Sequence, residues 1–164
     1  MVDFSVFAAL SAVWFAPLGS SLPSEPLRRD TTPSASRIQS ELGPKLCKGS
    51  SIYFPSSPEF ADLTERWSVR AEGDILVVVV PACDNDVALA VKFANLINIP
   101  FLSITRGHGT PLALSSIKHG LLIKTNKLDT IDVANDGKTA TLGGGVYTDQ
   151  LLAKLAETNK VAGE

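Results

Sequence analysis

The hydrophobic pattern is strongest in residues 74–104, where a strand is predicted at each end. Residues 74–80 read DILVVVV and are followed by Pro81. A continuous β-branched run of this length is typical of a strand buried on both faces, as in a covered parallel sheet. A second, shorter strand is predicted over Phe101–Ile104, directly after Pro100.

A helix with one apolar face is predicted between these strands. Its apolar positions recur at helical spacing, at Val87, Ala90, Val91, Ala94 and Ile97. Asp84 is predicted to cap the helix, because a carboxylate accepts hydrogen bonds from the free amides of the first turn. Asn98 is expected to end the helix, and Pro100 prevents its continuation. Together the segments predict a strand–helix–strand unit with parallel strands.

A smaller α+β layer is predicted to follow. Short strands are expected at Gly120–Ile123, at Leu128–Val133 and at Thr139–Leu142. In the second of these, Leu128 and Thr130, and less cleanly Ile131 and Val133, are expected to face inward. The turn between the last two is signalled by Asn135-Asp136-Gly137, because these residue types tolerate positive φ. The pattern therefore predicts a hairpin.

A glycine run and a helix are predicted after the hairpin. Gly143–Gly145 lacks the Lys-Ser/Thr of a triphosphate-binding loop and is expected to mark a close packing point. A helix with leucines on one face is predicted to begin at Tyr147 or Thr148.

The N-terminal residues 1–21 are predicted to be a secretory signal peptide. Phe4–Leu18 is an apolar run shorter than a membrane span of about 20 residues, and small residues follow it. The start Met1-Val2-Asp3 is acidic where signal peptides are usually basic. A buried helix and an uncleaved anchor are the alternatives. The pattern favours a secreted protein without a stable membrane anchor.

Residues 22–45 are predicted to be a linker. Pro, Ser, Thr and Arg dominate this segment, which has too little apolar surface to offset the loss of backbone entropy on folding. A short helix around Ser36–Leu42 is the one element expected within it. Residues 46–164 are then predicted to form one α+β domain.

Charge and composition exclude several classes of protein. The 164 residues include 15 Lys and Arg against 17 Asp and Glu, a net charge of −2 that argues against a broadly basic surface for nucleic acid. Two histidines, His108 and His119, and two cysteines are too few for a metal site made by the protein alone. His119 is expected to be an ordinary surface residue.

Candidate chemistry is concentrated in the loop after the second strand. Its residues are Ile104, Thr105, Arg106, Gly107, His108 and Gly109. The glycines permit close approach and positive φ, and consecutive amides in such a loop form an anion-binding concavity suited to pyrophosphate. Ligands of open α/β sheets bind at the carboxyl ends of strands, where this loop lies, and Arg106 adds positive charge. A Gly-His-Gly turn without a ligand is the alternative.

The order of these segments resembles the N-terminal half of a flavin domain. The buried strand, the helix, the Ile-Pro-Phe-Leu segment and the Arg-Gly-His-Gly loop are followed by HGLLI, LDTIDV, the Asn-Asp-Gly turn and LGGGVYTDQLL. This order is similar to that of the FAD-binding domain of the p-cresol methylhydroxylase type (PCMH-type). Vanillyl-alcohol oxidase and the berberine-bridge-like oxidases share this domain, and secreted fungal oxidoreductases are the most similar subgroup. The resemblance covers residues 46–164 and is firmest over 74–155.

The resemblance implies a truncated PCMH-type FAD-binding fold with FAD as cofactor. In such families the loop wraps the FAD pyrophosphate, and its histidine, here His108, often bonds covalently to the 8α-methyl of the flavin. The usual Gly-Gly-His becomes Arg106-Gly107-His108, and Ile104 stands at the usual Arg position. Family members continue beyond the position of Glu164 with a second glycine-rich segment, a substrate domain and a C-terminal cap. This implies an N-terminal fragment that is not active alone.

Cys47 and Cys83 are predicted to form a disulfide. A secreted chain folds in an oxidising compartment, where an even pair of cysteines is commonly bridged. The bridge would join the segment before the first strand to the following strand–helix turn. Two separate buried thiols are the alternative.

Two functions follow from the sequence. The first is part of a secreted flavoprotein oxidoreductase, in which hydride passes from a C–H bond of an unidentified small-molecule substrate to FAD, with O₂ as acceptor. The second is a non-catalytic secreted domain that keeps the fold and binds FAD weakly or not at all.

Overall fold

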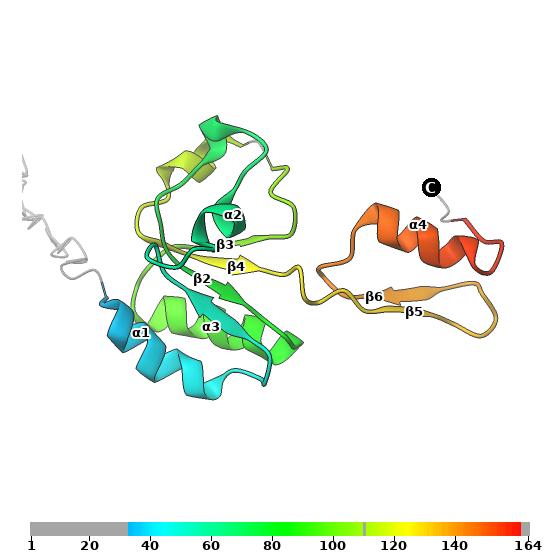
Figure 1. The fold of residues 1–164 in the computed structure, drawn as a ribbon, viewed down its shortest axis with the longest axis horizontal. Coiled ribbons are helices and arrows are strands. Elements are labelled where there is room, and N and C mark those ends of the chain that lie inside the picture. The colour runs from blue at the N-terminus through cyan, green and yellow to red at the C-terminus, as the bar shows by residue number, and fades with distance from the viewer. Residues whose placement is uncertain (1–32, 110, 162–164) are drawn as a thin grey trace, which may run out of the picture.

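The computed structural model describes residues 33–109 and 111–161, which contain a four-stranded sheet and a two-stranded hairpin (Figure 1). The order in the sheet is β1 (Ser51–Tyr53), β2 (Ile75–Val80), β4 (Gly120–Lys124) and β3 (Phe101–Ile104). The last three strands are parallel, and β1 is antiparallel to β2. The predicted parallel unit is present, but β4 lies between its two strands.

Helices cover both faces of the sheet. In Figure 1, α1 (Ala35–Leu42) and α3 (Asp84–Leu96) lie below it and α2 (Phe60–Thr64) lies above it. Val77 and Val79 of β2 pack toward α1 and α3, while Val78 and Val80 belong to the core on the opposite face. The DILVVVV run is therefore buried on both sides, as its composition predicts.

Helix α1 changes the predicted boundary of the domain. Ile38 and Leu42 are four residues apart on one face of α1, and both are almost fully buried against α3 and the sheet. The short helix is thus confirmed, but the linker predicted over 22–45 is wrong for residues 35–42. Two well-placed apolar side chains are enough to fix this helix, although the segment as a whole is polar. The signal peptide predicted for residues 1–21 lies outside the described residues.

Helix α3 begins differently from the prediction. Cys83 is at the N-cap position and Asp84 is the first helical residue, so the prediction that Asp84 caps the helix is wrong. Asp86 in the first turn accepts the N–H of Ala82 at 3.2 Å instead. Donors from the segment before β1 also converge on Asp86, which explains why this carboxylate, and not that of Asp84, turns inward.

The hairpin and the last helix form a smaller unit beyond the end of β4 (Figure 1). β5 (Ile131–Val133) pairs antiparallel with β6 (Ala140–Leu142) across the predicted turn, where Gly137 has a φ of +66°. α4 (Thr148–Ala156) packs against β5, and its Leu155 is buried. Leu128 is buried as expected, whereas Thr130 is exposed, because β5 begins only at Ile131. Within the described residues, no helix is long and apolar enough to cross a membrane.

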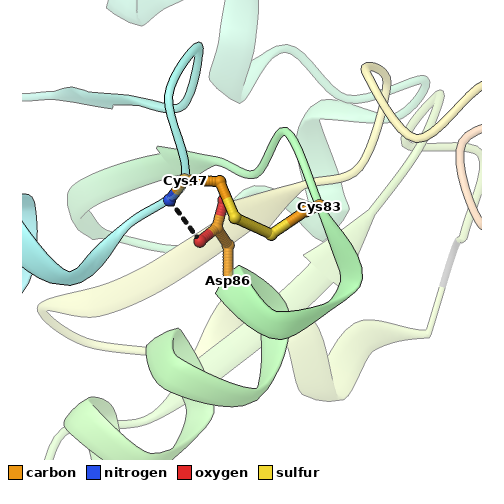
Figure 2. Close-up of side chains that lie close together, drawn as sticks. All are labelled: Cys47, Cys83 and Asp86. Atoms are coloured by element: carbon orange, nitrogen blue, oxygen red, sulfur yellow. Dashed lines mark hydrogen bonds between the residues drawn. A yellow bond between two sulfur atoms is a disulfide. The ribbon is translucent and has the colours of Figure 1, made fainter.

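A disulfide joins Cys47 to Cys83, as predicted (Figure 2). The two Cα atoms are 6.3 Å apart, and the bridge ties the segment between α1 and β1 to the turn between β2 and α3. The Asp86 carboxylate lies beside the bridge and accepts the N–H of Cys47 at 2.8 Å (Figure 2). The cross-link and this buried carboxylate therefore hold the same two segments together.

Removing the disulfide is expected to lower the stability of the domain moderately. A Cys47→Ser, Cys83→Ser double variant should lose about 2–4 kcal/mol, because the cross-link restricts a loop of 36 residues in the unfolded chain. Urea denaturation of the variant and of oxidised and reduced wild type would measure this difference. Two alkylatable thiols in the unreduced native protein would contradict the bridge.

Candidate functional site

A cleft of about 650 Å³ opens where β3 ends. One wall is the end of β3 and the following loop, residues 102–109, and another is the start of α4, residues 146–149. Arg66, from the segment after α2, also lines it. The cleft thus lies at the carboxyl end of a parallel strand, where ligands of open α/β sheets usually bind.

The loop is firmly anchored where it leaves β3. The Ile104 side chain is buried in the sheet core, so this residue offers the cleft little beyond its backbone. The Thr105 hydroxyl is 2.8 Å from the hydroxyl of Thr125 and donates to the carbonyl of Gly144 at 3.1 Å. Ile104 and Thr105 therefore fix the position from which the glycine-containing part of the loop starts.

The central part of the loop requires glycine and leaves its amides free. Gly107 has a φ of +79°, and a Cβ there would lie 3.0 Å from the carbonyl oxygen of Glu65. None of the backbone N–H groups of residues 106–109 donates a hydrogen bond to another described residue. Consecutive unpaired amides in a glycine-containing loop form a concavity that binds anions.

Arg106 is engaged with the start of α4. Its guanidinium carbon lies 3.9 Å from the centre of the Tyr147 ring, and its Nη2 is 3.2 Å from the Asp149 carboxylate. Both charged side chains are substantially exposed, so the ion pair contributes less than about 1 kcal/mol. The predicted phosphate contact of Arg106 stays a prediction, and it would require Arg106 to share or leave Asp149.

His108 is exposed and packs on a tryptophan. Its ring meets the ring of Trp67 edge to face, with centroids 5.6 Å apart and an interplanar angle of 74°. The backbone N–H of Trp67 also donates to the carbonyl of Gly107 at 3.3 Å. Trp67 therefore contacts both the histidine and the peptide just before it.

Arg66 is buried behind the loop. Its side chain donates from Nη2 to the Gly109 carbonyl at 2.8 Å, and the residue is only 8% exposed. Its Nε and Nη1 atoms have no hydrogen-bond partner. At the end of β4, burial lowers the pKa of Lys124, Glu65 partly opposes this shift, and the charge of Arg66 adds to it. Basic and acidic side chains thus both surround the loop, and Arg66 is the buried one among them.

Arg66, Trp67 and Lys124 were not identified from the sequence pattern. The first two form an isolated Arg-Trp pair in a polar segment about 40 residues before the loop, with no spacing or motif that links them to it. Two other interpretations are confirmed. His119 is a surface residue whose Nδ1 lies 3.0 Å from the Asp74 carboxylate, and Gly143 and Gly145 of the glycine run pack directly on backbone.

The fold and the site define an FAD-binding domain. The model of the FAD binding domain family matches residues 75–164, more than half of the chain, so the chain belongs to this family. Its fold is the α+β, PCMH-type fold, and FAD is its cofactor.

The chain is similar to fungal FAD-linked oxidoreductases. It is 38% identical over 122 residues to the FAD-linked oxidoreductase iacH of Pestalotiopsis fici, a match that covers 74% of this chain and 24% of iacH. It therefore spans about a quarter of the length of the curated relatives it matches.

Solved oxidases share the fold at lower identity. Chitooligosaccharide oxidase matches with a TM-score of 0.64 and 19% identity, over 76% of this chain and 26% of the oxidase. Glucooligosaccharide oxidase from Acremonium strictum matches with a TM-score of 0.62 and 17% identity, over 74% of this chain and 25% of the oxidase.

The residues around the cleft fit a dinucleotide cofactor. The unpaired amides of residues 106–109 provide donors for a pyrophosphate, and Gly107 allows the close backbone approach that such contacts need. The unpartnered, buried nitrogens of Arg66 leave a positive charge behind the loop that an anion would balance. The donor set is thus suited to the diphosphate of FAD.

Proposed function

We propose that this chain provides the pyrophosphate-binding loop and the covalent attachment residue of an FAD-dependent oxidoreductase. The observation that carries the proposal is the row of unpaired amides at residues 106–109, with the exposed His108 among them, at the mouth of the cleft. When bound, FAD would accept a hydride from a substrate C–H bond and pass the electron pair to O₂.

The residues of this chain bind and orient the cofactor. The loop amides would hold the pyrophosphate, and Thr105, fixed by Thr125 and Gly144, keeps the start of the loop in place. Edge-to-face packing on Trp67 favours one orientation of the His108 ring. The site therefore positions one imidazole at a defined point beside the bound diphosphate.

His108 is proposed to bond to the 8α carbon of the flavin. The new bond joins a ring nitrogen to that carbon in place of one hydrogen on each, and O₂ takes up both hydrogens as hydrogen peroxide. Glucooligosaccharide oxidase from Acremonium strictum, which shares the fold, has a 6-S-cysteinyl, 8α-N1-histidyl FAD. The flanking glycines support the same role here, because they leave the ring of His108 accessible.

Secretion is part of the proposal. The Cys47–Cys83 disulfide supports it, because such bonds persist in oxidising compartments. The apolar Phe4–Leu18 run supports it as well, as a signal-peptide core. N-terminal sequencing of secreted material should then give a start near Leu22, and an intracellular protein that keeps Met1 would contradict this.

The 164-residue chain on its own is proposed to retain FAD poorly and to lack turnover. The His108 side chain is exposed, so a flavin joined to it would remain in contact with solvent. The alternative function, a domain that keeps the fold without catalysis, predicts the same weak retention. A test that distinguishes the two functions therefore uses the protein encoded by the longest natural reading frame that contains this sequence.

The flavin test compares wild type, His108→Ala and His119→Ala in that longer protein. Wild type should be yellow and keep its flavin after acid precipitation, because unfolding does not break a histidyl bond. His108→Ala should release essentially all flavin into the acid supernatant, while His119→Ala, changed at the other, surface histidine, should retain it. Wild-type flavin that dissociates freely in acid would rule out the covalent role. A longer protein that binds no flavin would favour the non-catalytic function.

A further inference from the structure

Arg66 is a buried charge without an ion-pair partner among the described residues. The residue is 8% exposed, and its Nε and Nη1 atoms are buried and unpartnered. No ion pair among the described residues includes Arg66. A buried guanidinium without a carboxylate is unfavourable, because buried charges need a partner to offset the loss of hydration.

The backbone around Arg66 lies directly against the candidate loop. A Cβ on Gly107 would lie 3.0 Å from the Glu65 carbonyl oxygen, and one on Gly109 would lie 3.4 Å from Arg66 Nη2. Arg66 Nη2 donates to the Gly109 carbonyl, and the Trp67 N–H donates to the Gly107 carbonyl. Residues 65–67 therefore hold one side of the loop.

These contacts also set the direction of a loop amide. In a trans peptide the N–H points opposite to the carbonyl of the same peptide plane. Because the Gly107 carbonyl points to Trp67, the N–H of His108 points away from residues 65–67. The segment that contains Arg66 thus turns this donor toward the opposite side of the loop.

We propose that Arg66 is the positioning residue of the loop and the buried counter-charge of the diphosphate bound there. The inference rests on the proposed function and extends it to a residue outside the loop. Arg66 lines the cleft, but its Nε and Nη1 atoms are buried and its Nη2 donates to Gly109, so it acts by holding the loop and through its charge. A diphosphate bound at the loop amides would balance this charge, and the burial of Arg66 reduces the screening of the attraction by solvent.

If Arg66 has this role, replacing it should weaken anion binding without a large loss of stability. An uncompensated buried charge destabilises the unliganded domain, so replacing Arg66 by the uncharged and similarly long Met should change the thermal midpoint by less than about 5 °C. Its affinity for an anion should nevertheless fall. A purely structural Arg66 would show the opposite pattern, with a large loss of stability and unchanged affinity of the folded fraction.

The test uses calorimetric titration of the 164-residue chain with inorganic pyrophosphate, ADP and FAD. We expect Arg66→Met to bind pyrophosphate and ADP about tenfold more weakly than wild type and with a weaker dependence on salt. Arg66→Lys keeps a positive charge at this position and should stay within about threefold of wild type. The matched control is Arg37→Met, which removes an exposed charge on α1 that pairs with Glu41, and it should bind as wild type does.

The outcomes distinguish this inference from the proposed function. Affinity of Arg66→Met within twofold of wild type would overturn the role of Arg66, and so would an Arg66→Lys variant as weak as Arg66→Met. Absence of pyrophosphate and ADP binding by wild type would overturn it too. If the Met variant does not fold, Arg66→Gln, which is also uncharged, takes its place in the comparison with wild type and Arg66→Lys. Arg66-dependent binding of pyrophosphate by this chain, together with a longer protein that binds no flavin, would instead contradict the proposed function alone.

Discussion

Replacing Gly145 by Ala is expected to destabilise the domain by at least about 3 kcal/mol, while the same change at Gly144 should be tolerated. A Cβ on Gly145 would lie 2.0 Å from the carbonyl oxygen of Thr125, and at Gly144 it would meet nothing within 4 Å. The obstacle is backbone, which cannot rotate away as a flexible side chain can. Gly145 also donates its N–H to the carbonyl of Leu128 at 2.8 Å, so any shift that relieves the clash weakens this bond.

The measurement is urea denaturation of Gly145→Ala, Gly143→Ala and Gly144→Ala. Gly143→Ala should resemble Gly145→Ala, because its Cβ would lie 2.1 Å from the Leu128 carbonyl oxygen. Amide hydrogen exchange should show the loss of protection first in β5, β6 and α4, which the turn joins to the sheet. Equal urea midpoints for the Gly144→Ala and Gly145→Ala variants would contradict the close packing of Gly145 on the Thr125 carbonyl.

The glycine turn also connects this packing to the cleft. The Gly144 carbonyl accepts hydrogen bonds from the hydroxyls of Thr105 and Thr125, each at 3.1 Å. Thr105 is the second residue of the candidate loop, and Tyr147 and Asp149, just after the turn, hold Arg106. Displacement of the turn should therefore alter the loop geometry as well as stability.

The elements with strong local patterns could be predicted from the sequence. The β-branched run of β2, the Phe101–Ile104 strand and the helical spacing of α3 each arise from neighbouring residues, and all three appear where expected. The Asn-Asp-Gly turn and the need for glycine in the loop are likewise local, because each depends on backbone conformation at one or two positions.

Features that depend on distant contacts could not be predicted. Arg66 meets Gly109 across 43 residues, and Asp86 meets the Cys47 amide across 39. The position of β4 between β2 and β3 depends on how the strands pair in three dimensions, which the hydrophobic periodicity of the sequence does not specify. The burial of α1 depends on a partner surface from α3 and the sheet, which the polar composition of residues 22–45 does not reveal.

The candidate site likewise contains some residues with a local sequence signal and others that depend on distant contacts. Residues 104–109 were found because glycines and a histidine in one loop are a local signal. The residues that hold this loop in place, Arg66 and Trp67, come from a segment whose relation to it exists only in three dimensions. A loop that binds an anion can thus be recognised from sequence, whereas the residues that support it require the structure.

Replacing Asp86 by Ala is expected to cost about 3–5 kcal/mol at neutral pH. The Asp86 side chain is fully buried and accepts hydrogen bonds from the backbone N–H groups of Cys47 and Ala82 and from the Ser50 hydroxyl. The change to Ala leaves the Cys47 N–H beside the disulfide (Figure 2) and the Ser50 hydroxyl without this acceptor, while the Ala82 N–H keeps the Ser50 oxygen at 3.0 Å. Asp84→Ala is the matched control, because Asp84 is an exposed acid in the same helical turn, and it should cost well under 1 kcal/mol beyond its effect on the helix dipole.

The contribution of Asp86 should also depend on pH with a defined sign. Burial alone would raise the pKa of Asp86, but hydrogen bonds from Ser50 and from the backbone of Cys47, Ala82 and Cys83 outweigh it and hold the pKa below its ordinary value. A carboxyl whose pKa is lower in the folded state contributes its full stability above its unfolded pKa of about 4 and loses it as the pH falls through the folded pKa. The difference in unfolding free energy between wild type and Asp86→Asn should therefore be largest near pH 7 and shrink as the pH is lowered from 5 toward 2. A difference that stays constant or grows on acidification would mean that the donors around Asp86 do not favour its charged form.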